Sequence, residues 1–157
     1  MVFWWKLWKI NEIFGTPRRV ITGTMKTTIS HIGINLSSEE KCFPFWHGLL
    51  RYLEFELMLD GNHFDASDGH IFLCFSTTKP GYLDPPFHRK HTGLNHVAFS
   101  VASRDEVDQF VKEYLEPHDI PALYGGAKEY DYAPGYYAVY FEDPDRIKVE
   151  VAFTGKS

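Results

Sequence analysis

Two stretches of the chain repeat one alternation of polar and apolar residues. Residues 31–36 read His-Ile-Gly-Ile-Asn-Leu and residues 96–101 read His-Val-Ala-Phe-Ser-Val, so apolar side chains occupy every second position after a leading His. Because side chains alternate between the two faces of a strand, this period predicts a strand with one face in a core and the other small and polar. A helix-start signal, Ser with Glu three residues later, follows each stretch. We therefore expect a duplicated unit that begins with a strand and continues into a helix.

The rest of each unit has the spacing of short strands. In the first unit we expect a helix capped at Ser37 over 39–53 and strands over 28–36, 55–59, 63–67 and 70–77. In the second unit we expect a helix over 104–116 and strands over 94–101, 120–124, 135–141 and 147–153. A linker rich in Pro and Gly over 79–91 separates the units. The order βαβββ, found twice, predicts an α+β fold with mostly antiparallel sheets, in modules of about 28–78 and 93–154.

The polar faces of three predicted strands carry residue types that bind metals. His31 and His96 begin the two matching strands, and Glu150 lies on the last strand, opposite the apolar positions 147, 149, 151 and 153. Taken singly, such a His or Glu is more often a structural residue. Two imidazoles and one carboxylate on shared faces nevertheless suit a divalent ion such as Fe(II) or Mn(II), and they leave coordination positions open for a substrate with two oxygens.

The same residues lie in three motifs that resemble the vicinal oxygen chelate superfamily, which includes glyoxalase I, bleomycin-resistance proteins, fosfomycin-resistance proteins and extradiol dioxygenases. The motifs are His31-Ile-Gly-Ile, Gly93-Leu-Asn-His-Val-Ala-Phe and Tyr140-Phe-Glu-Asp-Pro-Asp-Arg-Ile-Lys-Val-Glu150. The last is the most specific, because the family places an Asp-Pro turn between two strands and a ligand Glu on the second. The resemblance spans roughly 28–153. It implies two βαβββ modules paired into a cup-shaped sheet around one divalent metal, with His31, His96 and Glu150 as its ligands.

Several positions depart from the family pattern. Arg146 stands where the Asp-Pro-Asp-Gly turn of the family has Gly, which puts the geometry of the turn in question. Cys74 stands where glyoxalase I supplies a Glu ligand, and the sequence leaves open whether its thiol contributes to the site. Without that Glu the general base of glyoxalase I is missing, so methylglyoxal is not the expected substrate. Gly33 and Ala138 replace a Thr and a Ser of the fosfomycin-resistance enzymes, so fosfomycin is not expected either.

The resemblance implies an enzyme that acts on a small substrate with vicinal oxygens, as a lyase, an isomerase or a ring-cleaving dioxygenase. Its cofactor would be one divalent ion, Fe, Mn, Zn, Ni or Co. We expect Glu150 and Tyr140 as the catalytic residues, since alternation places Tyr140 on the same face of a neighbouring strand. The alternative is a metal-free protein of the bleomycin-resistance type that sequesters an aromatic compound, which suits an aromatic content of 17%. Those relatives lack the three ligands, so we favour the metal-dependent enzyme.

Composition limits the other functions and partners. A length of 157 residues suggests one domain, and a net charge of −5 provides no basic surface for nucleic acid. No apolar run reaches the ~18 residues of a membrane span, so we expect no membrane association. The two cysteines form no disulfide framework, which fits a reducing cytoplasm. The resemblance also implies a homodimer, and whether one chain or two form each metal site stays open.

Residues 1–24 differ from the rest of the chain. They contain three of its four Trp, and four basic residues against one acid. An interfacial anchor, a secretory signal and an extension outside the domain are the three interpretations, although Lys6 and Lys9 interrupt the apolar region that a signal requires. We favour an extension with a non-native start, in which Met25 is the functional first residue of a domain over 25–157.

Overall fold

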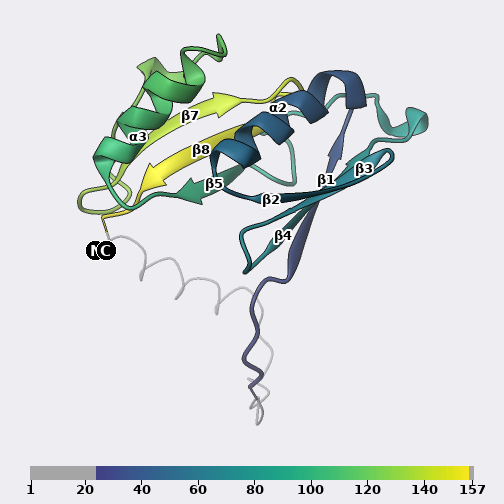
Figure 1. The fold of residues 1–157 in the computed structure, drawn as a ribbon, viewed down its shortest axis with the longest axis horizontal. Coiled ribbons are helices and arrows are strands. Elements are labelled where there is room, and N and C mark those ends of the chain that lie inside the picture. Colours follow the sequence, from purple (N-terminus) through teal and green to yellow (C-terminus); the bar gives the residue numbers. More distant parts are fainter. Residues whose placement is uncertain (1–23, 156–157) are drawn as a thin grey trace, which may run out of the picture.

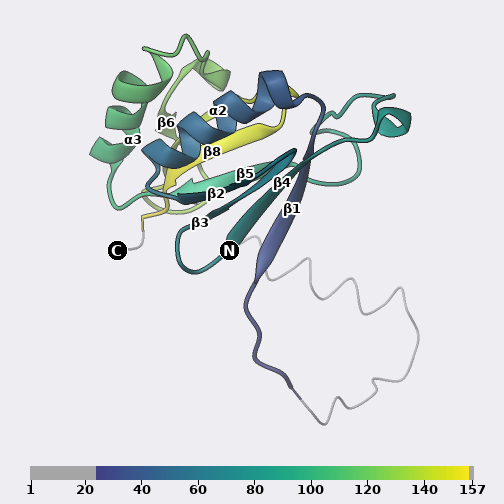
Figure 2. The same ribbon diagram turned by 45° about the vertical axis from the view of Figure 1, so that its right-hand side comes forward.

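The computed structural model describes residues 24–155, in which two modules follow one another along the chain (Figures 1 and 2). The expectation for the extension therefore falls almost wholly outside the described residues. The first module contains β1 (His31–Leu36), α2 (Glu39–Tyr52), β2 (Glu56–Asp60), β3 (His63–Ser67) and β4 (Phe72–Thr77). The second contains β5 (His96–Ser100), α3 (Arg104–Phe110), β6 (Lys128–Glu129), β7 (Tyr137–Glu142) and β8 (Lys148–Phe153). A short 3-10 turn, η1 (Pro80–Tyr82), lies in the linker that joins them.

Each module forms its own four-stranded sheet. The strand order is β1-β4-β3-β2 in the first module and β5-β8-β7-β6 in the second. In both sheets the first strand runs parallel to the last strand of its module, and the other strand pairs are antiparallel. The repeated βαβββ order and the mostly antiparallel pairing confirm the predicted α+β fold.

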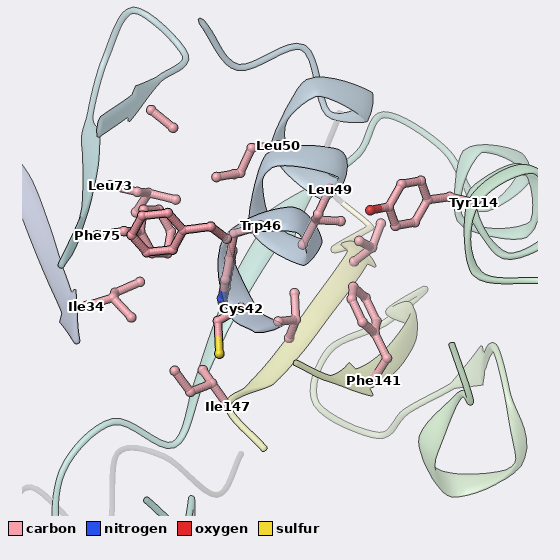
Figure 3. Close-up of a cluster of buried hydrophobic side chains, with 14 of the residues drawn as sticks. Ile34, Cys42, Trp46, Leu49, Leu50, Leu73, Phe75, Tyr114, Phe141 and Ile147 are labelled. Atoms are coloured by element: carbon pink, nitrogen blue, oxygen red, sulfur yellow. The ribbon is translucent and has the colours of Figure 1, made fainter. Parts of the chain in front are cut away.

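One hydrophobic core joins the two modules. Both ribbon views show α2 alongside β8 of the other module, and the ring of Phe45 on α2 lies 6.2 Å from that of Phe141 on β7. The same helix packs on the first sheet, where the ring of Trp46 lies 4.8 Å from that of Phe75 (Figure 3). Trp46, Phe75 and Phe141 are completely buried. Burial of this apolar surface therefore holds the modules against each other.

Polar contacts tie the start of α2 to the turn between β7 and β8. Trp46 Nε1 donates to Asp143 Oδ2 at 2.9 Å, inside the core. Asp145, two residues further along the turn, accepts from the backbone N–H of Ser37 at 2.6 Å and also from the Ser37 hydroxyl. Since Ser37 immediately precedes the helix region, these bonds fix the β7–β8 turn of the second module to the first module.

Both predicted helices are present, with two differences in detail. The cap of α2 is Ser38, whose hydroxyl accepts from the backbone N–H of Lys41 at 3.3 Å, and not Ser37, which is engaged by the turn. The second helix changes at its C-terminal half into a π-helical turn, η2 (Val111–Leu115). Between residues 24 and 155, neither helix is long and apolar enough to cross a membrane.

One predicted strand is wrong. The segment over 120–124 leads into a 3-10 turn, η3 (Leu123–Gly125), and the two-residue strand β6 pairs with β7 in its place. Tyr124 has a φ of 58°, and Gly125 follows with a φ of 86°. Positive φ values are incompatible with an extended strand, so the chain turns here before it reaches the sheet.

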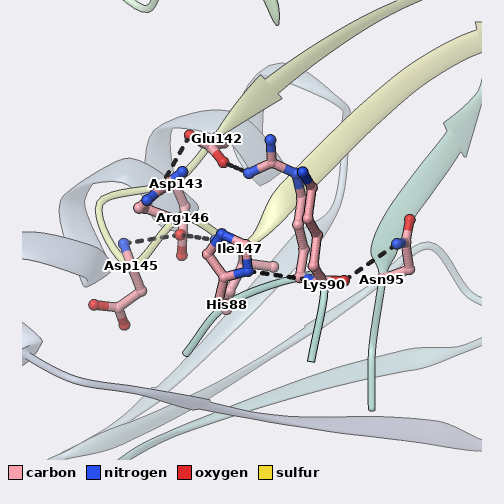
Figure 4. A network of polar contacts seen from close by, with 9 residues as sticks. His88, Lys90, Asn95, Glu142, Asp143, Asp145, Arg146 and Ile147 are labelled. Atoms are coloured by element: carbon pink, nitrogen blue, oxygen red, sulfur yellow. Dashed lines mark hydrogen bonds and ion pairs between the residues drawn. The ribbon is translucent and has the colours of Figure 1, made fainter. Parts of the chain in front are cut away.

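The β7–β8 turn forms although Arg146 replaces the glycine of the family pattern (Figure 4). Asp143 Oδ1 accepts from the backbone N–H groups of Asp145 at 2.9 Å and of Ile147 at 2.8 Å. The Arg146 backbone N–H donates to the Asp143 carbonyl at 2.9 Å. These bonds hold Arg146 at a φ of 67°, a left-handed conformation that costs a residue with a Cβ roughly 1–2 kcal/mol.

Replacing Arg146 by glycine should therefore stabilise the protein. We expect Arg146→Gly to raise the free energy of unfolding by about 1 kcal/mol, measured by urea denaturation. The matched control is Arg146→Ala, which removes the exposed ion pair with Glu142 but keeps the strained backbone. Equal stabilities of the Gly and Ala variants would show that the turn stores no such strain.

Burial makes Asp143 sensitive to pH. The side chain is 4% exposed, and burial raises the pKa of its carboxyl from 3.8 to about 6, against the opposing effect of its hydrogen bonds with Trp46 and the turn backbone. A folded pKa above the unfolded value means that the folded state binds the proton more tightly. Its contribution to stability is complete below about pH 4 and is lost as pH rises through about 6.

This shift predicts a pH-dependent difference between the native protein and Asp143→Asn. Between pH 4 and 6, the stability of the native protein relative to the variant should fall by about 2 kcal/mol, because only the native protein carries the titrating group. Urea unfolding at a series of pH values measures the difference. Asp131→Asn, which changes an exposed carboxylate, is the control, and parallel pH profiles for the native protein and Asp143→Asn would contradict the shift.

Candidate functional site

The second sheet brings His96 and Glu150 together. Parallel pairing of β5 with β8 places His96 beside Lys148 and Ala98 beside Glu150, so both ligand candidates lie on the same face of neighbouring strands. The His96 Nε2 atom lies 3.0 Å from Glu150 Oε2. The His96 side chain is 35% exposed and that of Glu150 is 1% exposed. The Glu150 carboxylate is therefore enclosed, and the imidazole of His96 is the more exposed member of the pair.

Two tyrosine hydroxyls occupy the other oxygen of this carboxylate. Glu150 Oε1 accepts from the Tyr140 hydroxyl at 2.7 Å and from the Tyr136 hydroxyl at 2.5 Å. Burial, and the Glu150 carboxylate that accepts their hydrogen bonds, raise the pKa of both phenols above the usual value. Both tyrosines therefore remain protonated donors at neutral pH, and Oε2 is the oxygen that faces His96.

A tyrosine-rich segment over 123–136 covers this face of the second sheet. The Tyr130 ring meets the Tyr140 ring edge-on at 5.2 Å, and the Tyr132 ring stacks on Tyr130 at 5.4 Å. Small residues on the sheet, Ala138 and Ala152, are buried beneath the segment. The face of the second sheet that carries Glu150 is thus lined by tyrosine rings. Alternation along the strand predicted only that this face points away from the core.

Tyr136 was not singled out from the sequence as a partner of Glu150. Tyr136 precedes β7 by one residue and has the same parity as Ala138 and Tyr140, so extending the alternation backwards would have placed it on the site face. Tyr130 lies beside Tyr140, in the tyrosine-rich segment. Its hydroxyl oxygen is buried and has no hydrogen-bond partner in the described range 24–155.

The structure does not bring His31 to this pair. His31 lies on the exposed face of β1 with Gly33 and Asn35, as its alternation predicts, and its Nδ1 is 3.3 Å from Ser30 Oγ. Within residues 24–155, no three His, Cys, Asp or Glu side chains are grouped closely enough to hold one ion. Of the three expected ligands, one chain therefore brings only His96 and Glu150 together, and His31 lies on the other sheet.

Cys74 lies on the same exposed face as His31. It pairs with Gly33 on β1 and with Asp65 on β3. Burial, with a contribution from the Asp65 carboxylate, raises the pKa of the Cys74 thiol. Because a thiol binds metal as the thiolate, this environment does not favour Cys74 as a ligand.

The geometry of the His96–Glu150 pair fits a metal centre. Ligand atoms about 2.1 Å from an ion and at right angles around it lie about 3 Å apart. The 3.0 Å separation of His96 Nε2 and Glu150 Oε2 matches this spacing. Two hollows among the described residues, of about 780 and 820 Å³, are lined by neither of these residues. The candidate site is therefore the Glu150 face of the second sheet rather than either hollow.

Comparison with known proteins identifies the family. No protein-family model matches the chain. The uncharacterized protein YqjT of Bacillus subtilis (strain 168) is 35% identical over 124 residues, which cover 77% of this chain and 94% of YqjT. A presumed glyoxalase from Bacillus halodurans, known from its crystal structure, is 37% identical with a TM-score of 0.72 and covers 80% of this chain and 94% of its own. The chain belongs to the vicinal oxygen chelate superfamily of glyoxalases, bleomycin-resistance proteins and dioxygenases.

Two more distant structures share the fold. Lactoylglutathione lyase from Agrobacterium tumefaciens is 20% identical with a TM-score of 0.59, over 83% of this chain and 96% of that one. The fosfomycin resistance protein FosX from Listeria monocytogenes is 18% identical with a TM-score of 0.60, over 82% of this chain and 94% of that one. Identities this low establish a common architecture and do not assign an activity.

The two hydroxyls on Glu150 predict unequal effects of three Tyr→Phe substitutions. Tyr140→Phe and Tyr136→Phe each remove a hydrogen bond to a buried carboxylate and should lower the free energy of unfolding by about 2 kcal/mol. Tyr130→Phe removes a buried hydroxyl that has no partner among residues 24–155, so it should be neutral or stabilising. Urea denaturation compares the three. Equal losses in all of them would mean that the hydroxyl bonds to Glu150 are not what distinguishes these positions.

Proposed function

We propose that the protein is a divalent-metal-dependent enzyme that acts on a small substrate with two neighbouring oxygens. The observation that carries this proposal is the 3.0 Å separation of His96 Nε2 and Glu150 Oε2 on one face of the second sheet. Nitrogen and oxygen ligands of this kind suit Fe, Mn, Zn, Ni or Co. The third ligand in the proposal is His31.

We further propose that His31 comes from a second copy of the chain, in a homodimer. His31 is exposed on β1, and β1 and β5 are edge strands that pair on one side only within the described residues. Juxtaposing the two edges between copies would set the exposed face of one first sheet beside the second sheet of the other. Because a two-fold axis repeats every contact, such a dimer would contain two equivalent sites.

The chain's own residues prepare the site for one binding mode. The hydroxyls of Tyr136 and Tyr140 hold Glu150 Oε1, so Oε2 is the oxygen that remains for an ion. Tyr140 keeps its proton and serves as a hydrogen-bond donor beside the substrate. The tyrosine-rich segment over 123–136 excludes water from one side of the carboxylate. A bound divalent ion would supply Lewis-acid activation of the substrate oxygens or, in the case of a redox-active metal, activation of O₂.

The finer assignments of reaction and location also belong to this proposal. Lyase, isomerase and ring-cleaving dioxygenase chemistry are the candidate reactions. A cytoplasmic location is supported by Cys42 and Cys74, which are both free thiols. The alternative function, metal-free sequestration of an aromatic compound, is favoured by one observation, the stacked rings of Tyr130 and Tyr132 over the second sheet.

Elemental analysis of the untagged protein, after chelator treatment and reloading with each ion, tests the proposal. We expect about one ion per chain in the native protein and in His118→Ala, an exposed His after the second helix. His96→Ala and Glu150→Gln should bind less than a tenth as much metal, since each variant loses one of the proposed protein ligands. Full metal content in either variant would exclude these ligands, and a native protein that takes up no ion would favour the sequestering function.

Mixing two deficient variants tests the shared site. His31→Ala and Glu150→Gln should each lose the metal alone. After unfolding and refolding together, they should recover about one ion per four chains, because half of the dimers are mixed and each mixed dimer has one complete site. No recovery, with size-exclusion chromatography showing that mixed dimers had formed, would mean that His31 does not reach the other chain's site.

A further inference from the structure

A positively charged side chain, that of Lys148, lies on the site face. Lys148 is two residues before Glu150 on β8, so it points to the same face, and it pairs with His96 on β5 and Glu142 on β7. Among the described residues, Lys148 takes part in none of the salt bridges. Its half-buried side chain therefore lies directly beside His96 and two residues before Glu150.

The acid that pairs with Lys148 across the sheet is Glu142, and two arginines already contact its carboxylate. The carboxylate of Glu142 contacts the guanidinium of Arg89 from the linker and lies 3.6 Å from Arg146 Nε (Figure 4). Glu142 is thus engaged by Arg89 and Arg146, and among the described residues it forms no ion pair with Lys148.

Aromatic contacts hold the ammonium group toward the reacting centre. Lys148 Nζ lies 5.1 Å from the centroid of the Tyr140 ring. The same ring lies 6.1 Å from that of His96, and its hydroxyl donates to Glu150. Cation–π attraction to Tyr140 therefore keeps Lys148 close to the space in front of His96 and Glu150.

We propose that Lys148 binds an anionic substituent of the substrate, so the substrate class is a vicinal-oxygen compound that also carries a carboxylate. This inference rests on the proposed function, because the two oxygens would face His96 and Glu150 while the acid group meets Lys148. A charge-assisted hydrogen bond from an ammonium to a carboxylate is stronger than one between neutral groups. Lys148 is a specificity-determining residue and takes no part in the chemical step.

A pair of probes that differ by one carboxylate isolates this contact. Catechol and 3,4-dihydroxybenzoate present the same two neighbouring hydroxyls, and only the second carries an acid group. Both are titrated at low salt into the Co(II)-loaded protein, with the visible absorption of Co(II) and the intrinsic fluorescence as separate readouts. The native protein should bind 3,4-dihydroxybenzoate about tenfold more tightly than catechol.

Three variants then assign the preference to Lys148. Lys148→Met keeps an unbranched side chain over Tyr140 and should bind both probes equally, with the affinity for catechol unchanged. Lys148→Arg should keep the preference for the acid. Lys41→Met, which removes the same charge from an exposed position on α2, should behave as the native protein. Melting temperatures of all variants establish that each one is folded.

The outcomes separate this inference from the function on which it rests. Absence of Co(II) absorption bands in the native protein would count against the metal site. If fluorescence then still showed tighter binding of 3,4-dihydroxybenzoate than of catechol, and Lys148→Met abolished this difference, the role of Lys148 would stand. Normal Co(II) bands without any preference for 3,4-dihydroxybenzoate would overturn the inference and leave the metal site intact. Equal weakening of both probes in Lys148→Met would also overturn it, because a structural role affects both alike.

Discussion

A buried carboxylate sets the main constraint on the second module. Glu150 is 1% exposed, and an ionised group in that position is unfavourable unless its oxygens are paired. Side chains from three elements contact it: the hydroxyls of Tyr140 on β7 and of Tyr136 before β7 donate to it, and the imidazole of His96 on β5 lies 3.0 Å away. The sheet register, the tyrosine-rich segment and the small residues beneath it are all needed to satisfy this one group. The candidate site is therefore also a structural requirement of the module.

A second set of polar contacts relates the two modules. Trp46 of the first module donates to Asp143 of the β7–β8 turn inside the shared core, and Ser37 donates to Asp145 of the same turn at the surface. The turn connects directly to β8, on which Lys148 and Glu150 lie. Placement of the site face thus depends on contacts with the first module, although the site residues described in one chain come from the second. This dependence explains why a residue as strained as Arg146 is held in place within the turn.

Alternation along the strands correctly identified which face each candidate residue occupies. His31 and His96 lie on the faces away from the core, and so do Tyr140 and Glu150, because a strand gives its side chains no other choice. Local signals were less reliable where tertiary contacts competed with them. Ser37 carries a helix-start signal, yet the Asp145 carboxylate engages it and the cap moves to Ser38. The segment over 120–124 has apolar residues typical of a strand, but the left-handed conformation at Tyr124 makes it a turn.

The sequence by itself determined the duplicated βαβββ order, the faces of the strands and the family resemblance, since these depend on local periodicity and motif spacing. Only the tertiary structure decided which of the candidate residues meet. Parallel pairing of β5 with β8 sets His96 3.0 Å from Glu150, whereas His31 lies on a different sheet and is exposed. The two hydroxyls on Glu150 and the position of Lys148 beside His96 likewise follow from the register of three strands. Side-chain parity is a property of one strand, but distances between strands arise only when the chain packs.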